Sequence, residues 1–229
     1  MASFLKFFVL SIITLSCVSK SVKTPTDEMS MSTPSPKESI RTVTGEISHV
    51  DTSKLEIATL AGGCFWKMDA AYQQLRGVTK VEVGYAGGNV KNPTYEQVCT
   101  RTTGHAETVQ VTFDPKVVSF REILNVFWTI HDPTVLNQEG NDKGDDYRSV
   151  VFYRSEAQKG MAQIVKDSLD KVHLHPSPIV TTIEPFKNYY RAEQYHQNYY
   201  NQHPNEPYTY NVVRKKVELF EKVFATQLK

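Results

Sequence analysis

Two glycines and a cysteine separate an apolar stretch from a helical pattern in this chain. The stretch from Leu55 to Ala61 has the length of a buried strand, and Lys67 to Arg76 carries apolar residues at helical spacing. Gly62 and Gly63 permit a tight turn between the two elements. Cys64 is therefore expected near a helix N-terminus, where unpaired N–H groups and the helix dipole lower a cysteine's pKa and make it a nucleophile.

Two aromatic residues, Phe65 and Trp66, follow the cysteine directly. They place a large apolar surface beside the sulfur, which predicts a substrate with an apolar group. A free cysteine is more often a small buried hydrophobe. The flanking glycines and aromatic side chains favour the nucleophile.

The hydrophobic pattern predicts the order strand, helix, strand, strand, helix, strand. This order is typical of an α+β, two-layer ferredoxin-like (split βαβ) core, with an antiparallel or mixed sheet and helices on one face. The tail from Tyr189 to Tyr210 has weak periodicity and is expected to wrap the core. The expected strands are Leu55–Ala61, Val78–Tyr85, Thr108–Phe113, Ser149–Tyr153 and Ile179–Ile183, and the expected helices are Lys67–Arg76, Ser119–His131, Ser155–Val172 and Val212–Phe224.

The N-terminal residues carry a targeting pattern rather than a folded element. Lys6 and the apolar run Phe7 to Leu15 resemble a secretory signal spanning residues 1–17. Cys17 fits a bacterial lipoprotein processing site, with ordinary signal cleavage and a simple hydrophobic leader as the alternatives. Residues 18–53, rich in Ser, Thr and Pro, predict a flexible tether, and residues 54–229 one catalytic domain. We therefore expect an exported protein, periplasmic or anchored to a membrane.

Composition excludes several classes of function. A net charge of +1 over 229 residues argues against a nucleic-acid partner, and the run Arg214 to Lys216 is expected to be a solvated helix face. The 3 cysteines show neither CxxC spacing nor a Cys/His pattern, so no metal site and no bound cofactor are expected. Cys99 is expected to be a buried thiol.

Three polar loops provide partners for a cysteine nucleophile. Tyr95 offers a phenol at a helix start, Glu107 a carboxyl group at the beginning of a strand, and the loop from Gly140 to Arg148 several polar groups. Each also has a structural interpretation, as a turn tyrosine, a solvated strand end or a capped turn. His105 and His196 are expected to be structural hydrogen-bonding groups rather than bases.

Together these motifs resemble the A-type peptide methionine sulfoxide reductases. The resemblance covers roughly Ile57 to Tyr200, in the family's order and spacing. The motifs that carry it are Gly63-Cys64-Phe65-Trp66, Gly84-Tyr85, Gly87-Gly88, Asn92-Pro93-Thr94-Tyr95, Gly104-His105-Ala106-Glu107, Gly140-Asn141-Asp142 and Tyr147-Arg148-Ser149.

The resemblance implies a role for each site residue. Cys64 would attack the sulfur of the S-epimer of methionine sulfoxide, and Glu107 would protonate the oxygen. It further implies that the aromatic pair Phe65 and Trp66 holds the substrate methyl group, that Tyr95 and Tyr147 hydrogen-bond the oxygen, and that Asp142 positions the substrate. The implied substrate is a protein or peptide with oxidised methionine, and free methionine sulfoxide as well.

Elementary chemistry agrees with this assignment. Sulfoxide oxygen is a poor leaving group, so attack at sulfur requires a proton on the oxygen as the S–O bond weakens. A neutral Glu107 can supply it if burial against Phe65 and Trp66 raises its pKa. Cys64 then becomes a sulfenic acid, which a second thiol must reduce.

The chain departs from the family pattern at two points. No cysteine follows Cys99, whereas many members carry resolving cysteines in a C-terminal tail. We therefore expect an external thiol, such as thioredoxin or glutaredoxin, to reduce the sulfenic acid. Asp146 also replaces a glutamine often present before Tyr147, which adds negative charge near the site.

Two other functions fit the same residues. Cys64 could serve a hydrolase or acyltransferase with His105 or His196 as base, forming an acyl-enzyme. Alternatively, Cys64 is inert and the aromatic residues form the pocket of a tethered, non-catalytic peptide-binding domain.

Overall fold

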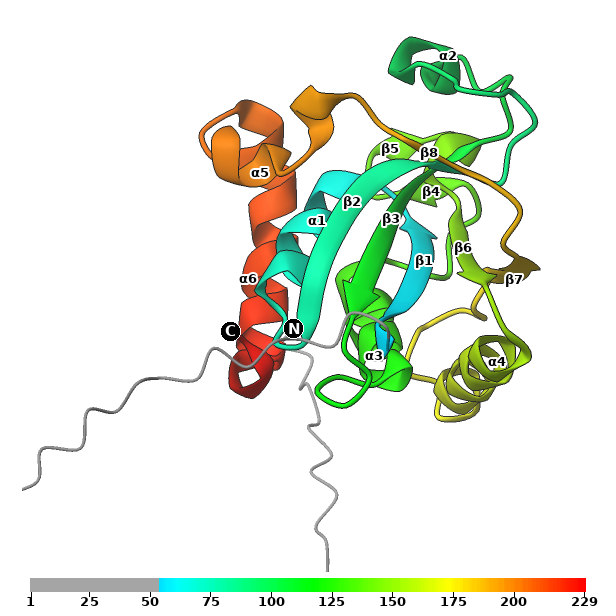
Figure 1. The fold of residues 1–229 in the computed structure, drawn as a ribbon, viewed down its shortest axis with the longest axis vertical. Helices are drawn as coiled ribbons and strands as arrows, with labels where there is room; N and C mark the ends of the chain where they lie inside the picture. The colour runs from blue at the N-terminus through cyan, green and yellow to red at the C-terminus, as the bar shows by residue number, and fades with distance from the viewer. Residues whose placement is uncertain (1–53) are drawn as a thin grey trace, which may run out of the picture. The chain divides into compact units, whose positions relative to one another are not determined.

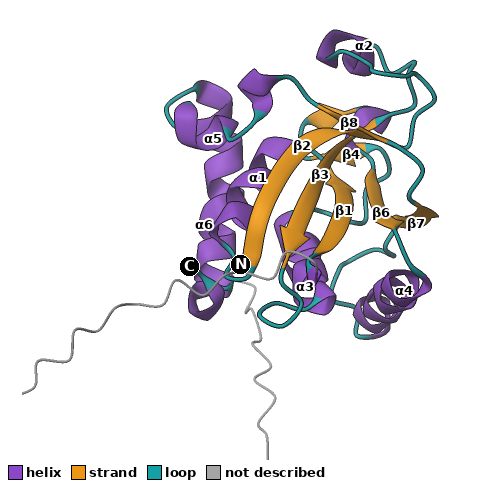
Figure 2. Cartoon of the chain, viewed as in Figure 1, coloured by secondary structure: helices purple, strands orange, loops and turns teal. Residues whose placement is uncertain are grey.

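A computed structural model describes residues 54–229 as a mixed sheet covered by helices (Figures 1 and 2). The predicted signal and tether, residues 1–53, lie outside the described residues. The 6-stranded sheet has the order β7-β6-β1-β3-β2-β8. Its strands are β1 (Glu56–Gly62), β2 (Val78–Ala86), β3 (Ala106–Phe113), β6 (Ser149–Tyr153), β7 (Thr182–Pro185) and β8 (Tyr189–Arg191), and a separate ribbon is formed by β4 (Gln138–Glu139) and β5 (Asp142–Lys143).

The connections confirm the predicted α+β topology. β1 and β2 are each antiparallel to β3, which lies between them, so β1 and β2 run parallel to each other. Helix α1 (Phe65–Gln74) connects β1 to β2, which makes a split βαβ unit. β6 pairs antiparallel with the other edge of β1, and β7 pairs parallel with β6.

The helices share one main core with a single face of the sheet. Side chains at alternate positions of β3, namely Val109, Val111 and Phe113, point into this core. None of the described helices is long and apolar enough to cross a membrane. The remaining helices are α2 (Tyr95–Cys99), α3 (Phe120–Ile130), α4 (Glu156–Lys171), α5 (Tyr199–Gln202) and α6 (Arg214–Val223), of which α6 packs beside α1 (Figure 1).

The opposite face of the sheet is covered by the chain that follows β7. Small residues occupy this face, including Ala61, Ala86 and Ala106, and Phe186 and Tyr189 pack against them. The small side chains let an irregular segment lie close to the sheet. The predicted wrapping tail is therefore confirmed, and it also contributes β8, an edge strand paired with β2 that the sequence pattern does not predict.

Element boundaries agree with expectation where a local cap sets them and differ from it elsewhere. α3 begins as predicted, because the Ser119 side chain accepts from the Glu122 amide and the Glu122 carboxylate accepts from the Ser119 amide. α1 begins at Phe65 rather than Lys67, so Cys64 is the N-cap residue. The fifth predicted strand is β7, Thr182–Pro185 rather than Ile179–Ile183, since its position follows from pairing with β6.

Candidate active site

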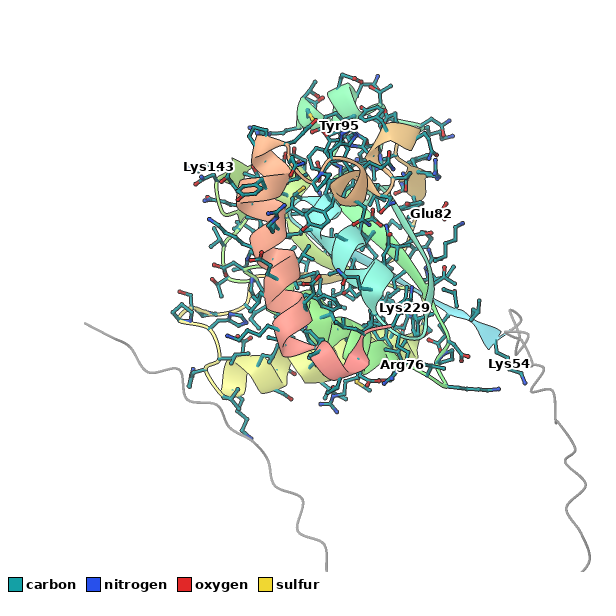
Figure 3. All side chains as sticks on the ribbon, turned by 90° about the vertical axis from the view of Figure 1, so that its left-hand side faces the viewer. Lys54, Arg76, Glu82, Tyr95, Lys143 and Lys229 are labelled. Carbon is teal, nitrogen blue, oxygen red and sulfur yellow. The ribbon has the colours of Figure 1, made fainter. Side chains whose placement is uncertain are left out.

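All seven residues predicted to form the site line one cavity of about 340 Å³. The cavity lies near Tyr95, at one end of the molecule (Figure 3). Glu206 and Tyr208 complete its wall, and neither was predicted. The predicted lining residues are Cys64, Phe65, Trp66, Tyr95, Glu107, Asp142 and Tyr147.

Strand direction explains why such distant residues meet. β1 ends where β3 and β6 begin, because both are antiparallel to β1, and Gly62 lies opposite Ser149. β2 ends beside the start of β3, with Tyr85 opposite Glu107. The segments that carry the predicted site residues therefore all lie at the same end of the strands.

Glu107 is a buried carboxyl group held by the first turn of α1. Its Oε2 accepts the backbone N–H of Phe65 at 3.0 Å. Burial, aided by the negative charges of Asp146 and Asp142, raises the pKa of Glu107 to about 8, against the lowering effects of the Phe65 amide and Lys67. Glu107 is consequently protonated at neutral pH, in the direction that the sequence predicts.

The expectation that the helix N-terminus lowers the pKa of Cys64 is wrong. Burial and the nearby Glu107 raise the pKa of the Cys64 thiol to about 12. The Tyr208 hydroxyl, the Trp66 amide and Lys67 act in the opposite direction but are outweighed. The Phe65 amide at the start of α1 is donated to Glu107 rather than to the sulfur, and the Trp66 amide alone does not offset burial. Cys64 therefore rests as a thiol.

The aromatic residues after the cysteine are fixed by the C-terminal segment. Trp66 stacks on Tyr199 with ring centroids 3.9 Å apart, and its Nε1 donates to Nδ1 of His196 at 3.2 Å. The Phe65 ring is buried and contacts His196 at a centroid distance of 5.1 Å. Both apolar surfaces thus have a single orientation before substrate binds.

Tyr208 is a site residue that the sequence analysis missed. Its hydroxyl donates to Oδ2 of Asp142 at 2.5 Å and also contributes a hydrogen bond to Cys64. It comes from the tail that follows α5, 66 residues after Asp142. The abundance of tyrosine in this tail is the only sequence signal that could have pointed to it.

Glu193 is a second missed residue, and it positions Tyr95. One carboxylate oxygen of Glu193 accepts the backbone N–H of Tyr95 at 2.9 Å, and the other accepts the hydroxyl of Tyr85 at 2.8 Å. These bonds attach the start of α2 to β2 and the C-terminal segment. Burial raises the pKa of Tyr95, so its phenol remains a proton donor.

The two candidate histidine bases have structural partners. The Nδ1 atom of His105 accepts the Gly88 amide, and its Nε2 bonds the Val90 carbonyl. His196 accepts from Trp66, and burial lowers its pKa to about 4, so it is a neutral ring among aromatic residues. Their expected structural role is confirmed.

Asp146 lies next to Tyr147, on the short helical turn Asp145–Tyr147 at the cavity wall. It is buried, and its Oδ1 lies 3.4 Å from Nε of Arg101. Arg101 follows α2 in the left-handed backbone region, with φ 61°. The predicted extra negative charge is present, and it raises the Glu107 pKa.

Cys99 differs from expectation because its thiol is exposed rather than buried. It is the last residue of α2 and shares a hydrogen bond with the Tyr95 side chain. Val98 is the buried residue of α2, so the adjacent Cys99 points away from the core. Cys64 and Cys99 are the two cysteines in the described part of the chain, and they are not joined.

A buried cluster of charges lies behind the cysteine. Lys67 and Lys216 share Oε1 of Glu139, at 2.7 and 3.2 Å. The Glu139 side chain also packs against the backbone of Gly63, where an added Cβ would lie only 2.4 Å from the Cβ of Glu139. Burial raises the pKa of Glu139, but the two lysines outweigh this effect and lower it to about 2. Lys216, whose side chain is 33% exposed, is thus only partly solvated, whereas a fully solvated face was expected.

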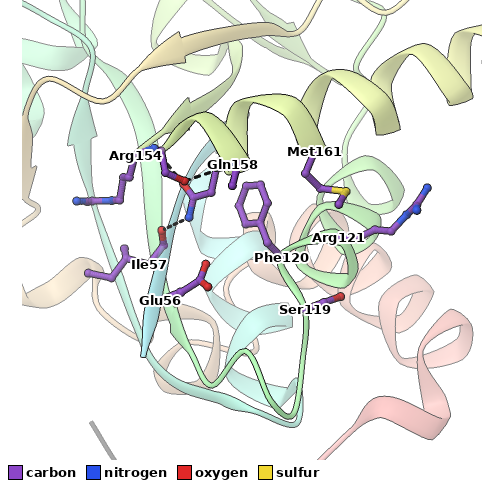
Figure 4. A pocket seen from close by; sticks show the side chains of 10 residues that line it. Glu56, Ile57, Ser119, Phe120, Arg121, Arg154, Gln158 and Met161 are labelled. Carbon is purple, nitrogen blue, oxygen red and sulfur yellow. Dashed lines mark hydrogen bonds between the residues drawn. The ribbon is translucent and has the colours of Figure 1, made fainter. Parts of the chain in front are cut away.

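A larger hollow of about 530 Å³ lies elsewhere, between β1, α3 and α4 (Figure 4). Gln158 on its wall already has partners, because it donates to the Ile57 carbonyl and accepts the Arg154 amide. It contains no cysteine or histidine. No group of three potential metal ligands occurs in residues 54–229. The cavity at Cys64 is therefore the candidate active site.

Comparison with known proteins places this site in a family of enzymes. Residues 56–228 match the model of the peptide methionine sulfoxide reductase family. A peptide methionine sulfoxide reductase MsrA from Saccharolobus solfataricus is 47% identical over 175 residues, which is 76% of this chain and 98% of that protein. One from Polynucleobacter asymbioticus is 50% identical over 179 residues, covering 78% and 94%.

Solved structures agree with this relationship. The reduced form of Mxr1 from Saccharomyces cerevisiae superposes with a TM-score of 0.63 at 36% identity, covering 69% of this chain and 91% of that one. Methionine sulfoxide reductase A of Corynebacterium diphtheriae gives 0.60 at 32% identity, covering 67% and 77%. The fold and site define a thiol-dependent oxidoreductase. The chain belongs to the peptide methionine sulfoxide reductase family, and it is an enzyme that reduces methionine sulfoxide.

The charge cluster behind Cys64 generates a stability prediction. Lys67→Met removes one partner of a buried carboxylate, so we expect it to lower the free energy of unfolding by about 3 kcal/mol. Lys80→Met is the matched control, because that lysine is 60% exposed in its pair with Glu82 and should change stability by less than about 1 kcal/mol. Urea denaturation measures both, and equal effects would contradict a contribution from the cluster.

Proposed function

We propose that this enzyme reduces the S-epimer of methionine sulfoxide, protein-bound and free, through a proton relay between Cys64 and Glu107. The observation that carries the proposal is the protonated Glu107 in the same cavity as the Cys64 thiol. A carboxyl group that is neutral at working pH can give a proton to the sulfoxide oxygen. The neighbouring aromatic rings of Phe65 and Trp66 suit the methyl group of the substrate.

The raised pKa of Cys64 changes how the first step must proceed. As the Cys64 sulfur bonds to the sulfoxide sulfur, Glu107 gives its proton to the oxygen, and the resulting carboxylate accepts the thiol proton. The S–O bond and the new bond between the two sulfurs then break as the hydroxyl group passes to the Cys64 sulfur. The products are methionine and a Cys64 sulfenic acid. The cysteine sulfur is oxidised, the methionine sulfur is reduced, and no net proton is consumed.

Hydroxyl groups around the cavity stabilise the oxygen during this transfer. Tyr95 and Tyr147 line the cavity with Glu107, and burial raises the pKa of both phenols, which keeps them as donors. Asp142, bonded by Tyr208, is available to position the substrate backbone. Donors oriented in advance towards a developing negative charge lower the barrier without reorganisation.

Completion of the cycle requires a thiol from outside the described chain. Cys99 is exposed at the far end of α2, and Cys64 is not paired with it. A thiol reductant of the thioredoxin or glutaredoxin type, or a small thiol, attacks the sulfenic acid, and a second thiol releases the enzyme from the mixed disulfide. No bound cofactor takes part in these steps.

The activity test compares the two cysteines. With a mixture of methionine sulfoxide diastereomers and dithiothreitol, the unaltered enzyme should consume only the S-epimer, and Cys64→Ser should consume neither. Cys99→Ser is the matched control and should retain full turnover. Chiral chromatography measures the epimers. An active Cys64→Ser protein would exclude the mechanism, loss of activity in Cys99→Ser would indicate that Cys99 resolves the sulfenic acid, and an acyl-enzyme would favour the hydrolase.

The relay also predicts a pH profile. Glu107 has its proton below a pKa of about 8, so methionine formation in a single turnover should be level below that pH and fall above it. Glu107→Gln cannot exchange a proton, so the rate should fall about 100-fold or more and lose this pH dependence. Rapid-quench measurement of methionine from about pH 6 to about pH 10 checks both. A rate that rises through pH 8 would show that the thiolate, not the thiol, reacts.

We also propose that the enzyme acts outside the cytoplasm, periplasmic or on the membrane through a lipidated Cys17. The support is the sequence pattern of residues 1–17, which the described structure does not include. Intact-mass spectrometry of the protein expressed in a bacterium should show removal of residues 1–16 and a diacylglycerol group on Cys17. Cys17→Ser should abolish the lipid mass. An unmodified full-length chain would contradict the proposal.

A further inference from the structure

A second cavity reaches Cys64 from another direction. It has a volume of about 220 Å³. Its lining includes the exposed residues Asp132, Gly140 and Val212 as well as the buried Cys64, so it extends from the surface to the cysteine.

The two cavities share three residues: Cys64, Asp142 and Tyr208. The side chains of Tyr208 and Asp142 are joined by a hydrogen bond, so this pair forms the partition between the cavities. The first cavity contains Glu107 and the aromatic rings that suit the sulfoxide. The second contains none of these groups.

We propose that this second cavity, which we call the thiol channel, is the route by which a small thiol reaches the Cys64 sulfenic acid. The proposal rests on the reductase cycle described above. With the sulfenic oxygen in the first cavity near Glu107, a nucleophile must approach the sulfur from another side. The thiol channel gives access from that side. The reductant then does not have to enter the substrate cavity after methionine has left it.

Charge and polarity indicate which thiols the channel accepts. Lys67 and Lys216 are outnumbered by Glu139, Asp132 and Asp142, so the channel does not select an anionic thiol. Val212 and Val213 make part of its wall apolar. The expected ligand is therefore a low-molecular-weight thiol without a strong net charge, while the small volume excludes a protein.

The chemistry of the step is balanced. The thiolate attacks the Cys64 sulfur, the S–S bond forms and the S–O bond breaks. Glu107 gives its proton to the departing hydroxide, which leaves as water, and regains the proton that the thiol released to solvent. A second thiolate attacks the outer sulfur of the mixed disulfide, which frees Cys64 and releases the oxidised disulfide. The incoming thiols are oxidised and Cys64 is reduced.

The test blocks each cavity separately in the Cys99→Ser background. Val212→Trp fills the mouth of the thiol channel at a residue that is 41% exposed, and Leu219→Trp on α6, 39% exposed and outside both cavities, is the matched control. Glu206→Trp narrows the other cavity, whose wall includes Glu206. Two rates are measured for each variant: methionine formation in one turnover without thiol, and reduction of the sulfenic acid by β-mercaptoethanol.

Excess hydrogen peroxide at alkaline pH, removed by desalting, generates the sulfenic acid from the thiolate fraction of Cys64, so the thiol step is measured whether or not sulfoxide is a substrate. We expect Val212→Trp to lower the rate constant of that step by about ten-fold, a barrier increase of about 1.4 kcal/mol, relative to methionine formation. Leu219→Trp should change neither rate. Glu206→Trp should slow only methionine formation.

Three results would overturn the proposal. These are an unchanged thiol step in Val212→Trp, an equal slowing of both steps, and a slower thiol step in Glu206→Trp, which would place the thiol in the substrate cavity. Absence of methionine in the first turnover of the unaltered protein would instead refute the proposed function. Circular dichroism confirms that each variant is folded.

Discussion

The hydrogen bond from the Phe65 amide to the Glu107 carboxyl group joins the first turn of α1 to the start of β3. It forms only when β1 and β3 pair in the observed register, because that pairing places the end of one strand beside the beginning of the other. It also takes the free N–H nearest to Cys64. The contact therefore holds the proton-donating carboxyl group beside the cysteine, while burial sets the protonation state of both groups.

Both reacting groups of the site, Cys64 and Glu107, are protonated at neutral pH. Burial raises the pKa of Cys64 to about 12 and that of Glu107 to about 8, so both groups are neutral near pH 7. Helix N-termini generally favour thiolate, but desolvation is the larger effect at this position. A neutral pair avoids two adjacent buried negative charges and retains the proton that the sulfoxide oxygen requires.

The C-terminal segment completes a site whose reacting groups lie in the first half of the domain. It supplies Tyr208 to Asp142, Glu193 to Tyr95, and Tyr199 with His196 to Trp66. Each contact restrains a residue that the family resemblance assigns to the substrate. The same segment covers the sheet face opposite the helices, so its folding and the assembly of the site are coupled.

The sequence by itself determined the order of the main strands and helices, the Cys64 and Glu107 pair through the family resemblance, and the absence of a cysteine between Cys99 and Lys229, because periodicity, turn residues and motifs are local properties of the chain. It did not determine the pKa of Cys64, the exposure of Cys99, the inward direction of Lys216 or the role of Tyr208. Those depend on which distant groups exclude water from a side chain or donate a hydrogen bond to it. Only the tertiary structure decides this, because strand register and the path of the C-terminal segment bring those groups together.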